Sequence, residues 1–497
     1  MRRVNPRIRA AHELDLPGAR ENAGLHEYDG LVQDLSPGGV AAGLGRLGHG
    51  PREADSHDEA HLAATEAALR TGYGQVEMHR WNPVVHLANL DLACYDREYA
   101  PEPDRADARR RHLAAWPDAV EAAVAALDRV PGPVATALMP AARGLAAGVT
   151  DATALSAHAR LVAHLETAAA DGHREVALGG SALGALMGDA EGMSIDLSRL
   201  SDRADREAER LAGLLHDACG RLAAGRPPND VVAGLTADHP GPEGVGPAAT
   251  ALIGVLTDFT RERHLLDEVD GECRVGPAPE SRRWAMAMMS WAAPYEPDAP
   301  SWYYVTPPDP SWPPEDQDEW MSVFSRTTLP AITAHEVTPG HFAHGRMLRR
   351  VTGDVRRGLF SAAFIEGWAL YAEELLLEEG FMDSDPRYCI GVCIEALVRV
   401  TRLRCALGIH TGAMTMAEAV AAFETDAFLK GPAARSEAER ATYDPTYGRY
   451  TWGKLEILDL RDEAMAAWGP RYSHLRFHRA LMELGGPPLG LIGDVLG

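Results

Sequence analysis

Two histidines and a glutamate in the second half of the chain have the residue types of a hydrolytic metal site. They lie in the stretch H-E-V-T-P-G-H, which begins at His335 and ends at His341. In the common pattern H-E-x-x-H, two histidines one helical turn apart bind zinc, and the glutamate beside the first is the general base. Here the second histidine comes six residues after the first, a rotation of about 120° on a regular helix. We therefore predict that Pro339 and Gly340 break the helix and bring the two rings together.

A carboxylate farther along the chain supplies the third ligand that such a site needs. Glu366 follows His341 by 25 residues, a gap that suits a turn and a second helix packed on the first. The three ligands would bind one zinc ion, with water in the fourth position and Glu336 taking the proton of that water. Glu373 comes seven residues after Glu366, so we expect it to point the same way and to accept a hydrogen bond from a ligand histidine. His344 would face the opposite side of the helix and ranks below His341 as a ligand.

Helices must position these residues, because apolar residues recur at steps of three and four over most of the chain. The expected helical segments are 57–70, 107–129, 151–170, 197–224, 316–380, 385–412, 415–430 and 449–468. The segment 294–314 is too rich in proline for a helix, and residues 302–305 are expected to form a short strand. The sequence thus predicts a mainly α fold with a minor β element.

The length of the chain predicts more than one lobe. A single hydrophobic core rarely serves more than about 250–300 residues, and this chain has 497. We expect two lobes around a deep cleft: an N-terminal helical lobe over residues 1–280 and a catalytic, metal-binding helical lobe over residues 281–497. The two are expected to be parts of one integrated fold.

The charge and the cysteines bear on partners and on compartment. With 48 basic and 72 acidic residues, the net charge is −24, a field that repels nucleic acid and anionic membranes. No apolar segment follows the basic N-terminal residues, and no window reaches the roughly 18 apolar residues of a membrane helix. Six cysteines give no disulfide framework, and Cys389 and Cys393, four residues apart, are expected to be core thiols. These features predict a cytoplasmic protein and leave the oligomeric state open.

The two chemical motifs are similar to those of a known family. H-E-V-T-P-G-H at 335–341 and E-G-W-A-L-Y-A-E at 366–373 resemble the bacterial domain-of-unknown-function 885 family, which carries H-E-x-x-P-G-H and E-G-W-A-x-Y-x-E. Looser matches at residues 35–37, 450–461 and 477–489 extend the resemblance over most of the chain. That family is regarded as metallopeptidase-like, in the gluzincin class. The resemblance therefore implies a zincin-like helical fold around a metal site.

The resemblance also assigns roles to single residues. The two histidines and Glu366 would be the metal ligands, and Glu336 would be the base. Tyr450 takes the place of the family's tyrosine, and His410 matches its G-I-H motif. Either residue would steady an oxyanion. The alternative for Tyr450 is a packed core tyrosine.

Four further residues are candidates for binding substrate. Arg402 and Arg461 would hold a substrate carboxylate bidentately, although a structural ion pair is the alternative for both and the favoured one for Arg461. Tyr303 and Tyr304 precede the metal helix, and one of them is expected to face a pocket shared with Tyr450, on the opposite side of the ion. The alternative is a proline-rich surface loop anchored by packed aromatic residues.

The leading prediction for function is a zinc-dependent hydrolase that cleaves an amide or peptide bond of a peptide or small amide by metal-activated water. Ala406 and Leu407 stand where the family usually has Asp-Thr, and Thr446 stands where it often has Gln. These departures point away from a generic peptidase substrate. One alternative is therefore a metalloenzyme, with iron or manganese, that acts on a non-peptide small molecule of specialised metabolism. Another alternative is an inactive homologue that only binds its ligand.

Overall fold

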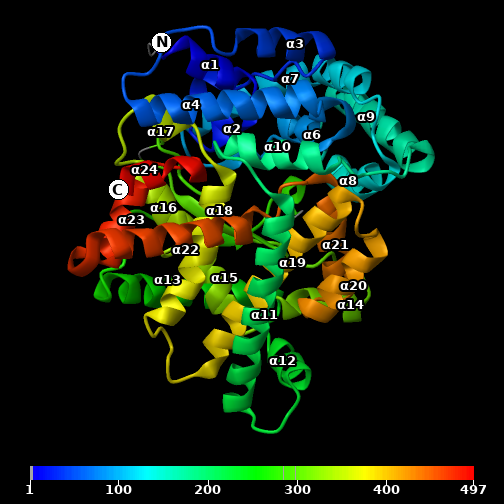
Figure 1. Ribbon diagram of the computed structural model, residues 1–497. Helices are drawn as coiled ribbons and strands as arrows, with labels where there is room; N and C mark the ends of the chain where they lie inside the picture. Colours follow the sequence, from blue (N-terminus) through cyan, green and yellow to red (C-terminus); the bar gives the residue numbers. More distant parts are fainter. Residues whose placement is uncertain (1–3, 284, 297, 497) are drawn as a thin grey trace.

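The computed structural model describes residues 4–283, 285–296 and 298–496, and the chain is mainly helical, as predicted (Figure 1). The helices up to residue 262 are α1 (Pro6–Glu13), α2 (Leu16–Glu21), α3 (Pro37–Arg46), α4 (Ser56–Leu69), α5 (Met78–Trp81), α6 (Val84–Leu90), α7 (Glu102–Ala126), α8 (Gly132–Gly144), α9 (Ala152–Asp171), α10 (Gly180–Ala190), α11 (Leu197–Leu222), α12 (Pro228–Thr236) and α13 (Pro242–Glu262). The later helices are α14 (Pro314–Ser322), α15 (Leu329–Glu336), α16 (His341–Leu348), α17 (Asp354–Gly358), α18 (Ala362–Glu378), α19 (Pro386–Thr411), α20 (Met416–Asp426), α21 (Gly431–Tyr443), α22 (Arg449–Trp468), α23 (His474–Met482) and α24 (Gly493–Leu496).

A small sheet separates these two sets of helices along the chain. Its strands are β1 (Cys273–Pro277), β2 (Ala287–Ser290) and β3 (Ser301–Val305), in the order β1-β3-β2. The central strand β3 confirms the predicted short strand; it pairs parallel with β1 and antiparallel with β2. Successive residues of a strand point to opposite faces. Tyr303 is fully buried in a cluster with Leu329 and Ile332 of α15, whereas the ring of Tyr304 stacks on Trp302, with centroids 5.7 Å apart.

Apolar side chains form one large cluster and several smaller ones. The largest joins residues 183–266 with residues 331–496, so helices on both sides of residue 280 share it. A second cluster lies within residues 81–165, where α7 and α8 each pack against α9. In Figure 1 the helices up to α9 occupy the upper part of the molecule, and most of the later helices lie below them. The boundary at residue 280 and a cleft between two lobes stay predictions.

Two pairs of helices hold the region that carries the chemical motifs. α11 packs along α19, and α18 crosses α22. At that crossing, a Cβ on Gly367 would lie 2.4 Å from the backbone of Gly453, so the two backbones are in direct contact. The side chain of Ser361 caps α18 by accepting a hydrogen bond from the amide of Phe364 at 2.9 Å. Asp385 caps α19 in the same way.

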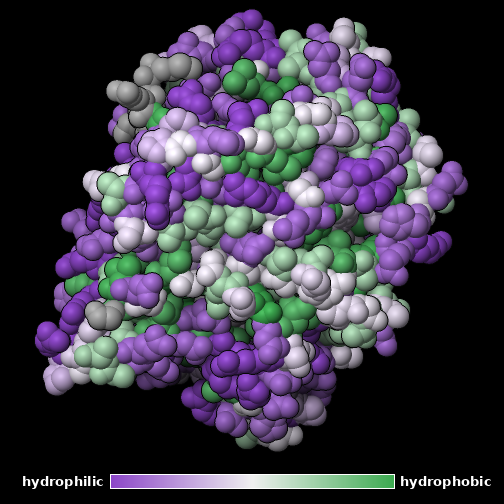
Figure 2. All heavy atoms as spheres, turned by 45° about the horizontal axis from the view of Figure 1, so that its top comes forward, coloured by the Kyte–Doolittle hydropathy of each residue, from purple (hydrophilic) through white to green (hydrophobic). Residues whose placement is uncertain are grey.

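The surface is largely polar. Figure 2 shows a face on which hydrophilic residues predominate, with smaller apolar areas between them. The largest exposed apolar side chains, such as Leu31 and Val255, lie far apart in the sequence, as is ordinary for a protein surface. Within the described ranges, every helix is either too short or too polar to cross a membrane.

Candidate metal centre

The break between α15 and α16 has the irregular backbone that the sequence predicted. Residues 337–340 separate the two helices, and the Thr338–Pro339 peptide is cis. The amide of Gly340 donates to the carbonyl of Ala334 at 3.1 Å, and the amide of Ala343 donates to the carbonyl of residue 337 at 3.0 Å. Each of these bonds spans six residues instead of the four of an α-helix. The two extra positions in the motif are thereby absorbed.

Close packing holds this break in place. A Cβ on Gly340 would lie 1.8 Å from the carbonyl oxygen of His335, so only glycine fits at this position. The indole Nε1 of Trp368, on α18, donates to the carbonyl of Pro339 at 2.9 Å. The break is therefore fixed both to α15 and to α18, with His341 as the first residue of the next helix.

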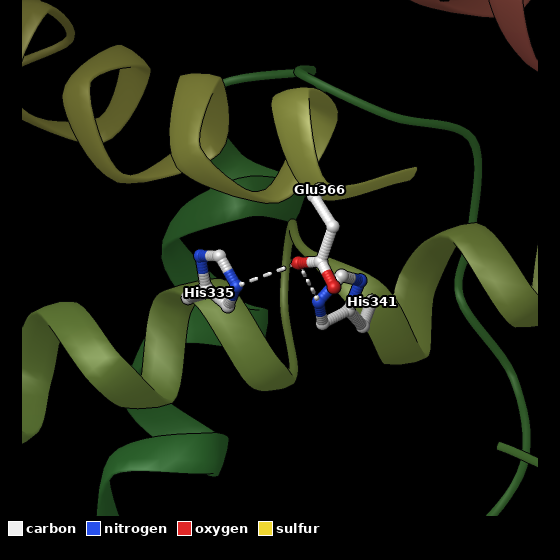
Figure 3. Close-up of side chains that lie close together, drawn as sticks. All are labelled: His335, His341 and Glu366. Carbon is white, nitrogen blue, oxygen red and sulfur yellow. Dashed lines mark ion pairs between the residues drawn. The ribbon is translucent and has the colours of Figure 1, made fainter. Parts of the chain in front are cut away.

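Three side chains converge as the predicted ligands would (Figure 3). The Nε2 atoms of His335 and His341 lie 3.6 and 3.3 Å from Oε2 of Glu366, and the three ligand atoms lie within 4.8 Å of one another. Glu373 Oε1 lies 2.8 Å from Nδ1 of His335. A proton on that Nδ1 leaves the Nε2 lone pair directed at the shared point. Across the described part of the chain, this is the one group of three or more His, Cys, Asp and Glu side chains whose ligand atoms lie close enough together to hold one metal ion.

The charges around the ligands suit a cation. Burial and Arg399 lower the pKa of His335, but Glu366 and Glu373 outweigh them and raise it to about 9. Burial raises the pKa of Glu366, but His341 and His335 outweigh it and hold that pKa well below its usual value. The site thus stabilises positive charge at the point where the three side chains meet.

A buried ion-pair network behind the ligands balances its own charge. It consists of four arginines and four acidic residues: Arg399, Arg402, Arg440, Arg449, Glu373, Glu395, Glu437 and Asp444. Glu336 and Glu366 have no lysine or arginine at ion-pair distance among the residues that the structure describes. A divalent cation would balance these two carboxylates, so both the donor set and the charge fit such an ion.

Glu336 lies beside the ligands and is buried. It is 6% exposed, and its Oε2 has no hydrogen-bond partner among the described atoms. Burial raises the pKa of Glu336, which suits a carboxylate that must take up a proton. Burial and the nearby Glu336 also raise the pKa of Tyr303, whose side chain packs in a cluster with residues of α15. The side chain of Tyr304 lies on the other face of β3, where its ring stacks on Trp302.

Tyr450 lies next to the ligand set. Its ring stacks on the ring of His335, with centroids 6.1 Å apart, and its hydroxyl lies 3.5 Å from Nη2 of Arg440. The guanidinium of Arg402 lies 4.9 Å from the centre of the same ring, while two of its nitrogens donate to Glu437 at 2.7 and 2.6 Å. Arg402 is therefore close to the site, but its Nε and Nη2 already donate to Glu437.

The sequence as a whole identifies the family. The protein-family model described as "Bacterial protein of unknown function (DUF885)" matches residues 17–496. The chain belongs to the DUF885 family. No curated protein matches it.

Solved structures share the fold of this DUF885 protein. The "putative lipoprotein of unknown function" from Shewanella oneidensis is 18% identical, with a TM-score of 0.76 over 98% of this chain and 97% of that one. The "putative lipoprotein" from Colwellia psychrerythraea is 15% identical, with the same TM-score and the same coverage.

Those descriptions overturn the predicted cytoplasmic location, which is wrong. Both neighbours are described as lipoproteins, and lipoproteins are extracytoplasmic. The cytoplasmic prediction rested on the small number of cysteines and on the N-terminal residues. A chain of this size buries a large core and needs no disulfides in an oxidising compartment. Its cysteine content therefore does not report where the fold is used.

Two predicted residues are not brought to the candidate metal centre of this DUF885 protein. His410 lies 11 residues beyond Arg399 on α19, about 16 Å along the helix, and its Nε2 bonds the carbonyl of Ala441 at 2.7 Å. Arg461 pairs with Glu378 at 2.6 Å, at the opposite end of α18 from Glu366 and about 18 Å away along the helix. Both positions suit structural roles.

The structure adds residues that sequence reasoning missed. The ring of Trp291 lies 6.5 Å from that of His341 and forms one side of the centre, with no signal in the sequence. Arg399 lies 3.6 Å from Glu373 and binds Glu395 at 2.5 Å. The spacing of four between Glu395 and Arg399 on a predicted helix was the available signal. His344 bonds a backbone carbonyl through Nε2 and stays outside the ligand set.

Proposed function

We propose that this DUF885 protein is a metal-dependent hydrolase that cleaves an amide or peptide bond with activated water. The observation that carries the proposal is the convergence of Nε2 of His335, Nε2 of His341 and Oε2 of Glu366 at one point beside Glu336. The same motifs underlie the resemblance to gluzincin metallopeptidases. A peptide or a small amide is the proposed substrate, and zinc is the proposed ion.

The side chains of the chain itself divide the remaining work. A bound zinc ion would supply Lewis acidity to the carbonyl and to the water. Glu336 accepts a proton from the attacking water and transfers it to the leaving amine, which its raised pKa favours. Glu373 holds His335 in the tautomer and orientation that a ligand needs. The phenol of Tyr450, stacked on that histidine, steadies the developing oxyanion.

Metal analysis combined with a hydrolysis screen tests the proposal. The wild-type protein should hold about one zinc ion per chain and hydrolyse members of a panel of dipeptides and N-acyl amides. Glu336→Gln should keep the ion and lose activity by about 10²-fold or more, because the amide cannot accept the proton. His341→Ala should lose tight metal binding.

Matched controls separate these effects from general damage. Glu209→Gln and His216→Ala change the same residue types at exposed positions of α11 and should behave as wild type. Near-normal turnover by a zinc-loaded Glu336→Gln protein would contradict the role of the base. Unchanged metal content in His341→Ala would contradict the ligand set.

A further inference from the structure

A cavity of about 180 Å³ lies where the N-terminal ends of α18 and α22 meet α4 and α10. Its apolar wall includes Leu186, Met187, Phe360, Ala363, Trp452 and Pro488. Residues of α4 and α10 also line the cavity, and Figure 1 shows these two helices above α18, so helices from the first 190 residues supply one side of the wall. None of the motifs that predicted the metal site lies on those helices.

One helix position and two ring contacts connect this cavity to the metal centre. Ala363 in its wall lies three residues before Glu366, and so on the same side of α18. The ring of Phe360, also in the wall, lies 6.2 Å from that of Trp291, which in turn lies 6.5 Å from the ring of His341. Two ring contacts therefore connect the cavity to a proposed ligand.

The acidic and the basic side chain in the cavity wall, Glu191 and Arg449, already have partners, whereas Nδ1 of His61, also in the wall, has none among the described atoms. Glu191 accepts hydrogen bonds from the hydroxyl of Ser361 at 2.6 Å and from the amide of Leu489 at 2.9 Å. Arg449 donates to Asp444 at 2.7 and 2.8 Å. A charged ligand group would have to displace one of these interactions. An apolar group only has to replace water.

The size of the cavity sets the size of its occupant. A protein cavity of about 150 Å³ lined by apolar side chains holds a benzene molecule. The cavity here is slightly larger, so a branched aliphatic or phenyl group fits within it.

We propose that this cavity is the specificity pocket of the metal centre and that it receives an apolar side group of the amide substrate, of the size of a leucine or phenylalanine side chain. The assignment rests on the proposed hydrolase function. The substrates would then be amides with a bulky apolar group near the scissile bond.

Two hydroxamates test the pocket without relying on turnover. Acetohydroxamate binds zinc through its head group alone, and 3-phenylpropanohydroxamate adds one apolar arm. Calorimetry on the zinc-loaded wild-type protein should show the second binding about 10- to 100-fold more tightly, the gain expected from burying one apolar side group. Ala68→Phe and Leu186→Trp fill the cavity from α4 and from α10, and each should abolish this gain while acetohydroxamate binds as before.

A control on the same helix separates filling of the pocket from general disturbance. Ala63 of α4 is exposed, and Ala63→Phe should keep the full gain. Equal affinity of the two hydroxamates for the wild type, or an undiminished gain in folded Ala68→Phe and Leu186→Trp proteins, would overturn the pocket and leave the hydrolase proposal intact. Failure of acetohydroxamate to bind any zinc-treated protein would overturn both.

Discussion

Gly340→Ala should disturb the candidate metal centre through the backbone of the break between α15 and α16. The added Cβ would lie 1.8 Å from the carbonyl oxygen of His335 and 2.5 Å from that of Ala334, whereas real Cβ contacts are essentially never shorter than 3.0 Å. Both oxygens belong to the backbone, so no side chain can turn away to make room. The break must open by more than about 1 Å, far beyond the ±0.2 Å tolerance of metal–ligand distances.

The size of the effect follows from the contacts that this movement disrupts. Overpacking in a buried site costs about 1–3 kcal/mol, and loss of the hydrogen bond from Gly340 to Ala334 adds about 1 kcal/mol. We expect Gly340→Ala to lower the free energy of unfolding by about 2–4 kcal/mol. Zinc affinity should fall at least about 100-fold, because the opening separates His341 from His335.

Urea denaturation of the metal-free protein measures the first quantity, and zinc competition with a chromophoric chelator measures the second. Gly213→Ala in α11 is the matched control, because a Cβ there meets nothing within 4 Å. That control should gain about 1 kcal/mol of stability from helix propensity alone and keep its zinc affinity. Wild-type stability and wild-type zinc affinity in Gly340→Ala would refute the reasoning.

Glu373→Gln removes the charge that orients His335 and should weaken zinc binding by about 10- to 100-fold; unchanged affinity in the chelator assay would contradict that role. Tyr450→Phe keeps the stacked ring and loses only the hydroxyl, so kcat should fall by about 10²-fold with little change in KM. A kcat within twofold of wild type would exclude the phenol from the reaction. Burial raises the pKa of Glu191 to about 7, so between about pH 4.5 and 7 the folded state retains a proton that the unfolded chain releases. The free energy of unfolding of the wild type should therefore fall by up to about 3 kcal/mol as pH rises through that window, whereas that of Glu191→Gln should not. If the free energy of unfolding of both proteins depends on pH in the same way, this role of Glu191 is wrong.

The local part of the site could be predicted from sequence because it depends on spacing along single helices. The proline and glycine of the motif indicated the break, and the interval of seven between Glu366 and Glu373 placed both on one side of α18. The predicted helix 449–468 has the same bounds as α22, whereas no predicted helix covers α21. The helical pattern predicted over 316–380 is divided among α14 to α18, and of these divisions only the one at Pro339 and Gly340 was predicted.

The remainder of the site depends on which helices become neighbours. Spacing of four reveals the pair Glu395–Arg399, but it cannot show that Arg399 also reaches Glu373 on another helix. Strands β1 and β2 are short and pair with β3 across long intervals, so no local pattern marked them. His410 and Arg461 had suitable chemistry, yet each lies many residues from the part of its helix that meets the centre.

The two halves of the chain contribute different things to this centre. Every proposed ligand, the base and the ion-pair network come from residues after 330, whereas α4 and α10 supply part of the wall of the cavity beside them. The largest apolar cluster also joins residues 183–266 to the helices that carry the ligands. Removing the first half would thus expose the face of α19 that packs on α11, in addition to opening the cavity. Substitutions on α4 and α10 would change which amide is accepted without touching the chemistry, because those helices supply the cavity wall and none of the ligands.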